Sequence, residues 1–463
     1  MRAKMGSDNK NASRPARWAA VTLAALICVF ALAACQPTPG KEVVINQQRD
    51  YLETLVTSEQ FVKTDAPARV DEAFRNPATG LTVRFAADIE VPEVDTYAVL
   101  EVEEKTYSDE ELLRLFDYFK PEAILFQEIV YTKDQWLEQI MQYRNAGSMD
   151  ESYIQHMTEQ MNAAPDVFTP VAFSLDSVQA GGEYRAYCDN GDNTYAMFYG
   201  FKNGSRFSYA PDIEAYCAGE DTIDPLLSQE LMGDYEGEFP LSADSALPKA
   251  LEVLEVLGFS DAELIGSQKS REYKHGIPSS KCWEFTFTHG NHGLKNIFRR
   301  EVVMAGGDGL PAPVLVAPWS QEVIKITIGT AGVLYVDVQG AISYKQELAR
   351  NVVLLNFDEL KLRIREHFLA AFFYLPERMD DAAVEITRME LCTALVAAKD
   401  KPDAGRLIPA WRVTFASTGK MRAFTDGYGV YHPSETFSDP LSRYFSAING
   451  IYIEPRITGD YLG

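Results

Sequence analysis

The segment VIKITIGTAGVLYVDV, residues Val323–Val338, predicts an antiparallel β-hairpin. Ile324, Ile326 and Ile328 alternate with Lys and Thr, which is the two-residue period of a strand with one buried face. The turn falls on Gly-Thr-Ala-Gly at 329–332, after which apolar residues continue. We therefore expect two neighbouring strands of an antiparallel sheet.

A helix is predicted before this hairpin, over about residues 246–257. Asp244 or Ser245 is expected as its N-cap, with Pro248 in the first turn. Gly258 follows the last turn, where a residue with left-handed backbone commonly ends a helix.

A second helix is predicted after the hairpin. Asn356 and Glu359 stand at the spacing of a capping box. The apolar residues of the helix recur at helical spacing and are Phe357, Leu360, Ile364, Phe368 and Ala371. Strand-like runs follow at 384–392, 408–415 and 444–453. We therefore expect a helix packed on an antiparallel sheet, used twice in tandem, over residues 240–463.

The region before residue 240 is expected to mix strands and helices. Alternation starts at Leu81, Ser108 caps a helix with an acidic first turn, and strands return at 184–210. Two further helices are predicted, at 132–144 and 149–161. The fold class is therefore α+β. The predicted parts are a signal peptide at 1–34, a lipidated cysteine with tether and linker helix at 35–80, an N-terminal α+β domain at 81–240, and helix-on-sheet domains at 241–345 and 346–463.

The first 35 residues have the order of a bacterial secretory signal. Five basic residues precede the apolar run Trp18–Ala34, which is shorter than a membrane span. The run closes with Leu-Ala-Ala-Cys35, which resembles the lipobox of bacterial lipoproteins. This resemblance implies that the Cys35 sulfur carries a diacylglyceryl group, with acyl chains such as palmitate, and anchors the chain on the extracytoplasmic face of the cell membrane. An uncleaved membrane helix with an incidental cysteine is the alternative.

The composition excludes several classes of protein. The 463 residues are 46% hydrophobic and 24% charged, which is typical of a soluble globular body. The formal net charge of -24 repels phosphate backbones, so we expect no nucleic acid as a partner. The expected partners are the membrane, through the N-terminal lipid, and an envelope protein or peptide.

Four cysteines follow Cys35, and they permit three pairings. Cys188 and Cys217 are the expected disulfide, because both lie in one aromatic, turn-rich segment. Cys282 and Cys392 lie in separate strand-like runs, where a buried free thiol is common. An extracytoplasmic location allows a disulfide without requiring one.

Residues that suggest chemistry are few. His289-Gly-Asn-His292 can supply two zinc ligands, with Cys282 or an acidic group as a third, but known ligand spacings are missing and a solvated loop is favoured. Ser417-Thr-Gly-Lys420 matches the S-x-x-K motif and is interpreted as a hairpin turn, since the companion motifs are missing. We therefore expect no catalytic residue, no cofactor and no metal.

Three aromatic residues are candidates for a binding surface. Tyr199 belongs to a segment, 184–217, with nine aromatic residues around Asn/Asp/Gly turns. Trp411 follows Pro409 at the start of a strand-like run, and Trp283 begins another. Such residues can bind a peptide or a glycan. The favoured alternative places Trp411 in the core and the aromatic segment in a twisted hairpin.

Several landmarks together resemble an uncharacterised family of Gram-positive bacterial lipoproteins. They are the mature start Cys35-Gln-Pro-Thr-Pro, Trp319-Ser-Gln-Glu322, Leu354-Leu-Asn-Phe357, Leu407-Ile-Pro-Ala-Trp411 and Ala447-Ile-Asn-Gly450. The C-terminal part is similar to PepSY and YycI-type extracytoplasmic modules. We therefore expect a non-catalytic binding or regulatory protein of the cell envelope. The alternatives are an envelope hydrolase that acts on glycan or peptide through surface carboxylates, and a solute-binding lipoprotein.

Overall fold

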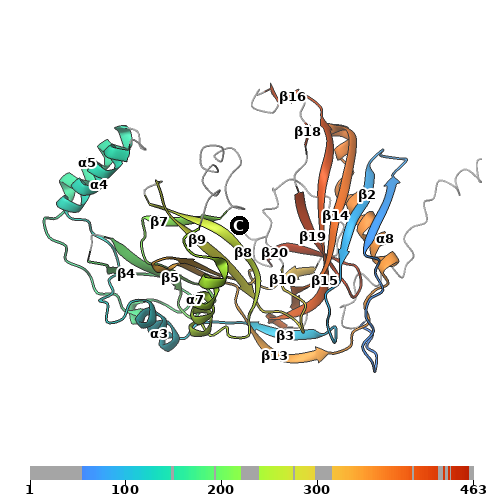
Figure 1. Ribbon diagram of the computed structural model, residues 1–463, viewed down its shortest axis with the longest axis horizontal. Coiled ribbons are helices and arrows are strands. Elements are labelled where there is room, and N and C mark those ends of the chain that lie inside the picture. The colour runs from blue at the N-terminus through green and yellow to red at the C-terminus, as the bar shows by residue number, and fades with distance from the viewer. Residues whose placement is uncertain are drawn as a thin grey trace, which may run out of the picture. The chain divides into compact units, whose positions relative to one another are not determined.

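The computed structural model describes residues 55–146, 151–191, 194–219, 239–274, 277–297, 315–398, 401–425, 431–432, 436–437 and 440–457. The predicted signal peptide and Cys35 lie outside these residues, as does nearly all of the predicted linker helix. The described residues form two large sheets, each with helices packed against it, so the chain is α+β as predicted (Figure 1).

The larger sheet is built around one long hairpin. β14 (Met379–Ala398) and β15 (Lys401–Met421) pair antiparallel from end to end. The order across this sheet is β1 (Arg69–Arg75), β2 (Thr82–Glu90), β14, β15, β19 (Pro440–Ser446), β20 (Tyr452–Ile457) and β10 (Leu315–Ala317). β3 (Val99–Glu104) pairs with β15 and with β13 (Ile342–Ala349), and β18 (Thr436–Phe437) pairs with β15.

Two pairings in the larger sheet differ from the antiparallel expectation. β2 runs parallel to β14, and β10 runs parallel to β20. Parallel partners need a long connection, and here each pair is far apart in sequence. β1 lies within the segment predicted to be linker, and β1–β3 share a sheet with β13–β20. The domain boundaries at residues 80, 240 and 345 stay predictions.

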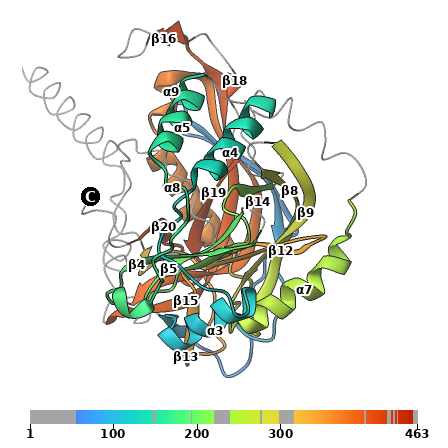
Figure 2. The same ribbon diagram turned by 90° about the vertical axis from the view of Figure 1, so that its left-hand side faces the viewer.

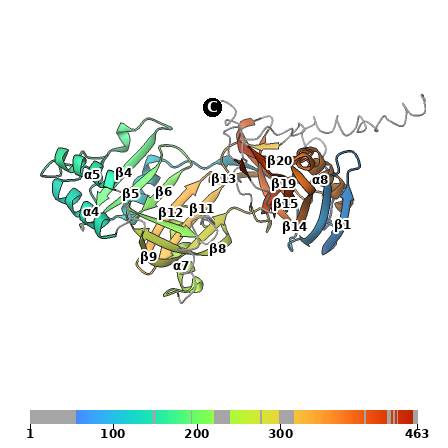
Figure 3. The same ribbon diagram turned by 90° about the horizontal axis from the view of Figure 1, so that it is seen from above.

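The smaller sheet is antiparallel throughout and contains the predicted hairpin. Its order is β4 (Glu183–Asp189), β5 (Tyr195–Phe201), β6 (Phe207–Ala210), β12 (Gly332–Gln339), β11 (Val323–Gly329), β9 (Ile277–Thr288), β8 (Glu263–Lys274) and β7 (Ala215–Gly219) (Figure 3). β11 and β12 pair with Gly329 opposite Gly332, so the hairpin and its turn are confirmed. A separate small pair joins β16 (Phe424–Thr425) to β17 (Tyr431–His432).

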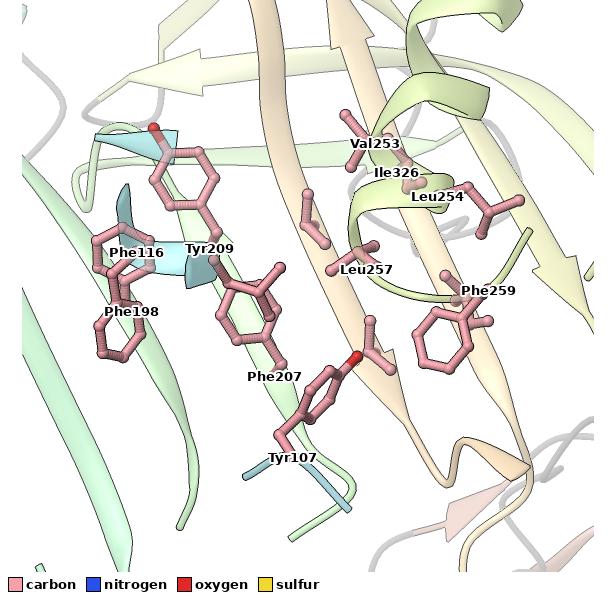
Figure 4. Close-up of a cluster of buried hydrophobic side chains, with 14 of the residues drawn as sticks. Tyr107, Phe116, Phe198, Phe207, Tyr209, Val253, Leu254, Leu257, Phe259 and Ile326 are labelled. Atoms are coloured by element: carbon pink, nitrogen blue, oxygen red, sulfur yellow. The ribbon is translucent and has the colours of Figure 1, made fainter. Parts of the chain in front are cut away.

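Two helices pack on the smaller sheet and close its main core (Figures 2 and 4). α3 (Asp109–Phe119) has the predicted Ser108 cap, in a capping box with Glu111. α7 (Ala243–Val256) begins earlier than predicted, because the Ser242 hydroxyl accepts the backbone N–H of Ser245; Pro248 therefore lies in the second turn. The core between these helices and the sheet includes Phe116, Phe198, Phe207, Tyr209, Val253, Leu254, Leu257 and Ile326.

The helix α8 (Phe357–Ala371) packs on the larger sheet through the predicted apolar stripe. The Phe357 ring lies edge-on to the Trp411 ring, with 5.6 Å between the ring centroids. The ring centroids of Phe368 and Phe415 are 4.6 Å apart. The predicted capping box is wrong. The Asn356 side chain accepts from Asp358 N, while Glu359 instead pairs with Arg363 at 2.6 Å.

The remaining helices are short or lie apart from the sheets. α4 (Lys133–Ala146) and α5 (Glu151–Ala163) are the two helices predicted there, and they pack on one another around a small core of Ile140, Ile154 and Met157. η1 (Leu175–Ser177) and α9 (Leu375–Arg378) are single turns. None of the helices in the described part of the chain is both long and apolar enough to span a bilayer.

Two further expectations are corrected in the larger sheet. The Ser417–Lys420 segment lies inside β15, where Lys420 pairs with Asp380, and is not a hairpin turn. The strand predicted at 444–453 is two strands, because Gly450 adopts a φ of 68° and ends the turn between β19 and β20. A side chain disfavours that backbone conformation, so glycine suits the position.

We predict that Trp411→Ala destabilises the chain by about 3–5 kcal/mol, since it removes a large buried side chain and leaves a cavity. Trp411 is 1% exposed. Urea unfolding monitored by circular dichroism measures the change. Phe373→Ala is the control, because Phe373 is 51% exposed, and should cost less than about 1 kcal/mol. Equal losses in the two variants would contradict the packing described here.

Candidate functional site

The segment His289–Ile297, called the connector below, links the two sheets. It follows the end of β9 at Thr288. The Asn291 side chain donates to Ala98 O at 2.8 Å, just before β3. Thr393 N of β14 donates to Lys295 O at 2.9 Å, and the Tyr444 hydroxyl of β19 donates to Ile297 O at 3.1 Å. One short segment of the smaller sheet's chain thus contacts three parts of the larger sheet.

The connector starts with a buried histidine held between two carboxylates. His289 is 3% exposed. Its Nδ1 lies 2.7 Å from Glu322 Oε1 and its Nε2 lies 3.1 Å from Asp261 Oδ1. The His289 backbone N–H also donates to Glu322 Oε2 at 2.6 Å. Both ring nitrogens can donate only in the imidazolium, so this geometry suits a charged His289.

The electrostatics of His289 agree with that geometry. Burial lowers the pKa of His289, but the hydrogen bond and negative charge of Glu322, followed by those of Asp261, outweigh it, so the pKa lies above its ordinary value. Glu322 is 1% exposed, whereas the Asp261 side chain is 60% exposed. The pair with Glu322 is therefore screened from water, and the pair with Asp261 is partly solvated.

Glu322 is positioned by the turn that precedes β13. Its Oε1 also accepts the backbone N–H of Ile342 at 3.0 Å, at the first residue of β13. Gly340 has a φ of 56° and lies so close to Ser320 that a Cβ would stand 2.0 Å from the Ser320 carbonyl oxygen. Glycine at 340 thus lets the turn pack against the residues that carry Glu322.

His289 and His292 do not converge on one metal position, although the sequence singled out both. His292 Nε2 bonds to Glu347 Oε2 at 2.7 Å, while both nitrogens of His289 face other carboxylates. In the described part of the chain, no group of three or more His, Cys, Asp or Glu side chains is arranged to hold a metal ion. The favoured solvated loop is also wrong for His289, because Glu322 draws its ring into the protein.

A surface pocket of about 320 Å³ lies beside the connector. Its lining residues are Glu93, Val94, Asp95, Thr96, His292 and Arg350. Carboxylates and a guanidinium therefore face the same small volume. Such a pocket suits a ligand that carries an ammonium and a carboxylate group, such as the end of a peptide.

The three predicted surface aromatics do not form one surface. Trp411 is buried in the larger sheet and is not accessible to a ligand. Trp283 is half-buried against the core of the smaller sheet, and its Nε1 donates to Leu241 O at 2.8 Å. Tyr199 lies on the opposite face of that sheet, with the Arg206 guanidinium 4.7 Å from its ring centre.

The predicted disulfide between Cys188 and Cys217 is not present. Both are free thiols, on β4 and β7, which are the two ends of the smaller sheet's strand order. Cys217 instead forms a hydrogen bond with Cys282 on β9. Cys392 is buried in β14 of the larger sheet. The spacing of the cysteines along the chain does not indicate the contact between Cys217 and Cys282, which only the fold creates.

Sequence reasoning missed the carboxylates of this site. Glu322 appeared only as part of the Trp319-Ser-Gln-Glu322 landmark, and Asp261 was not singled out. The chain has 67 Asp and Glu residues, so a single acidic position has no distinguishing pattern.

Comparisons with known proteins give distant likenesses only. No family model and no curated protein matches the chain. An uncharacterized protein from Eubacterium rectale is similar in structure, with a TM-score of 0.47 and 9% identity, over 84% of this chain and 94% of that one. The Bacillus megaterium YpeB C-terminal domain has a TM-score of 0.25 and 11% identity, over 61% and 85%. At these TM-scores neither likeness carries an argument, and the PepSY-type resemblance stays a prediction.

We predict that His289 stabilises the fold in a pH-dependent way. Because its pKa is raised in the folded chain, the stabilisation is complete below the ordinary histidine value of 6.5 and is lost as pH rises through the folded value. His289→Gln should therefore cost about 1–3 kcal/mol at low pH and less at high pH. Urea unfolding of both proteins between about pH 5.5 and 9 measures this. His292→Gln is the control, and a His289 effect that does not change with pH would contradict the charged state.

Proposed function

We propose that this chain is a lipid-anchored protein of the bacterial cell envelope that acts by binding, not by catalysis. The apolar run Trp18–Ala34 and the cysteine that follows it support the anchor. Two or three acyl chains, each contributing about 0.8 kcal/mol per buried methylene, hold a protein firmly on a membrane. The folded body then stands on the extracytoplasmic side, tethered through the proline-containing segment after Cys35.

The observation that supports binding over catalysis is that both ring nitrogens of His289 already have carboxylate partners. His289 has the raised pKa and the carboxylate partners of an acid–base catalyst, yet Glu322 and Asp261 occupy both of its nitrogens. Neither nitrogen is open to a substrate in this arrangement. The cluster of His289, Glu322 and Asp261 therefore stabilises the connector. The feature beside the connector that is open to a ligand is the surface pocket lined by Glu93, Asp95 and Arg350, called the mixed-charge pocket below.

The pocket supports a peptide as the bound partner. Arg350 can pair with a carboxylate and Asp95 can pair with an amine, while Glu93 already pairs with Lys63 at 2.7 Å, so the two ends of a short peptide or its charged side chains fit the lining. Exposed charges of this kind give modest affinity and steer association. A regulatory or sensing protein of the envelope needs contacts of that strength, which can form and break.

The anchor predicts a specific effect of Cys35→Ser. The full chain expressed in a Gram-positive host should incorporate an alkyne-labelled fatty acid and sediment with membranes, whereas the Cys35→Ser chain should do neither. Cys28→Ser is the matched control, because position 28 lies in the segment that would be removed. In-gel fluorescence and fractionation read the outcome. Equal labelling of wild type and Cys35→Ser would remove the basis for the anchor.

The pocket predicts how peptide binding should respond to charge changes. Short peptides with free termini should bind more tightly than the same peptides with capped termini. Asp95→Asn and Arg350→Ala should each weaken that binding about fivefold, because an exposed ion pair contributes about 1 kcal/mol. Arg69→Ala, on the outer strand β1, is the control. Calorimetry measures the affinities, and equal binding of free and capped peptides would argue against this pocket.

A further inference from the structure

One face of the smaller sheet is polar and buried. Neighbouring strands place Ser208 opposite Asp337, and Glu284 opposite Thr327, on the side away from α7. Ser208 donates to Asp337 at 2.7 Å, and Lys325 lies 3.2 Å from Glu284. The buried residues of this polar face are Ser208, Ser270, Glu272, Glu284, Thr327 and Asp337.

The sheet curls around this polar face. β7 is the last strand in the order, yet it contacts β12, which is four strands away. An open, flat sheet would keep those strands about 19 Å apart, at roughly 4.8 Å per strand. The curl therefore brings β7 toward strands that are not its pairing partners.

Two cysteines meet on the inside of this curl. Cys217 stands opposite Glu272 of β8, and Cys282 stands opposite Ser270 of the same strand. Those two positions on β8 are two residues apart, so both cysteines point to the same side of the sheet. Their thiols are hydrogen-bonded to one another. Cys188 and Cys392 lie on β4 and on the other sheet, respectively.

We propose that Cys217 and Cys282 form a redox-active pair that closes to a disulfide between β7 and β9. The location of the body outside the cytoplasm, where disulfides persist, rests on the proposed function. The thiol chemistry of Cys217 and Cys282 does not depend on the proposed function. Closure would tie the short edge strand β7 to the centre of the sheet, and reduction would release it.

The geometry permits closure with a small movement. Strands that flank a third one stand about 9.6 Å apart in a flat sheet, and a disulfide spans about 4.4–6.8 Å between Cα atoms. The curl already shortens that separation enough for the thiols to touch. β7 has five residues and pairs on one side with β8, so it can complete the approach without breaking a second ladder.

The reaction is thiol–disulfide exchange with a small-molecule disulfide. The hydrogen bond to Cys282 and burial raise the pKa of Cys217, and the same hydrogen bond lowers the pKa of Cys282. Cys282 is 0% exposed, whereas Cys217 is partly exposed, so a small disulfide reaches Cys217. The Cys217 thiol loses its proton to solvent, and the thiolate attacks one sulfur of the small disulfide and expels the other as a thiolate. Cys282 then loses its proton and attacks the Cys217 sulfur, which expels the second small thiolate. Two protein thiols are oxidised and one small disulfide is reduced.

Oxidised glutathione tests this on the purified full chain in detergent. After oxidation, the chain is denatured, the free thiols are blocked with N-ethylmaleimide, and peptides are mapped by mass spectrometry without reduction. We expect the peptides that contain Cys217 and Cys282 to be joined, with the loss of two hydrogen atoms, and Cys188 and Cys392 to carry maleimide. A bond between Cys188 and Cys217, or maleimide on both Cys217 and Cys282 in folded oxidised protein, would overturn the proposal.

Variants separate the pair from the other thiols. Cys217→Ser and Cys282→Ser should each abolish the joined peptide, and Cys282→Ser should also leave glutathione bound at Cys217, because the thiol that would displace it is missing. Cys188→Ser and Cys392→Ser should leave the joined peptide unchanged. The peptide map of the wild-type chain alone shows which cysteines are joined. The proposal can therefore be refuted even when a variant fails to fold. The result is independent of lipid at Cys35, so failure of the anchor and failure of the thiol pair are distinguishable.

Discussion

The arrangement of the two sheets depends on the carboxylate of Glu322. It accepts the backbone N–H and the ring N–H of His289, where β9 ends, and the backbone N–H of Ile342, where β13 begins. β9 belongs to the smaller sheet and β13 to the larger one. A buried charge with several hydrogen bonds tolerates little displacement, because each lost bond leaves a costly unsatisfied group. Several hydrogen bonds to one buried carboxylate thus hold the end of β9 in the smaller sheet against the start of β13 in the larger sheet.

The path of the chain explains why such a joint is needed. β1–β3 lie in the larger sheet, and the chain then builds the smaller sheet from β4 to β12, except for β10, which pairs with β20 of the larger sheet. It returns to the larger sheet at β13. Most strand partners of the larger sheet are consequently far apart in sequence. Bringing them together costs loop-closure entropy. The connector offsets part of that cost by bonding to residues next to β3, in β14 and in β19.

The polar groups of this protein are arranged in two different ways. Most ion pairs lie at the surface, as expected for a chain of net charge -24, and contribute little to stability individually. The polar face of the smaller sheet and the Glu322 cluster are buried instead, and there each carboxylate has specific partners. The mixed-charge pocket is lined partly by the connector, and the thiol pair lies on the polar face of the smaller sheet, so changes at either one act on strands or turns that are already held by hydrogen bonds.

Local patterns in the sequence determined the elements that depend on neighbouring residues. The Ser108 cap, the Gly329–Gly332 turn and the apolar stripe of α8 were all predictable, because each is set by residues within a few positions of one another. The parallel pairing of β2 with β14, the contact of Cys217 with Cys282 and the bond from Asn291 to Ala98 were not. Their partners are tens to hundreds of residues apart, and no local preference records a partner that only burial and sheet curvature bring near. Tertiary structure alone therefore decided which histidines are buried, which thiols meet and where the pocket opens.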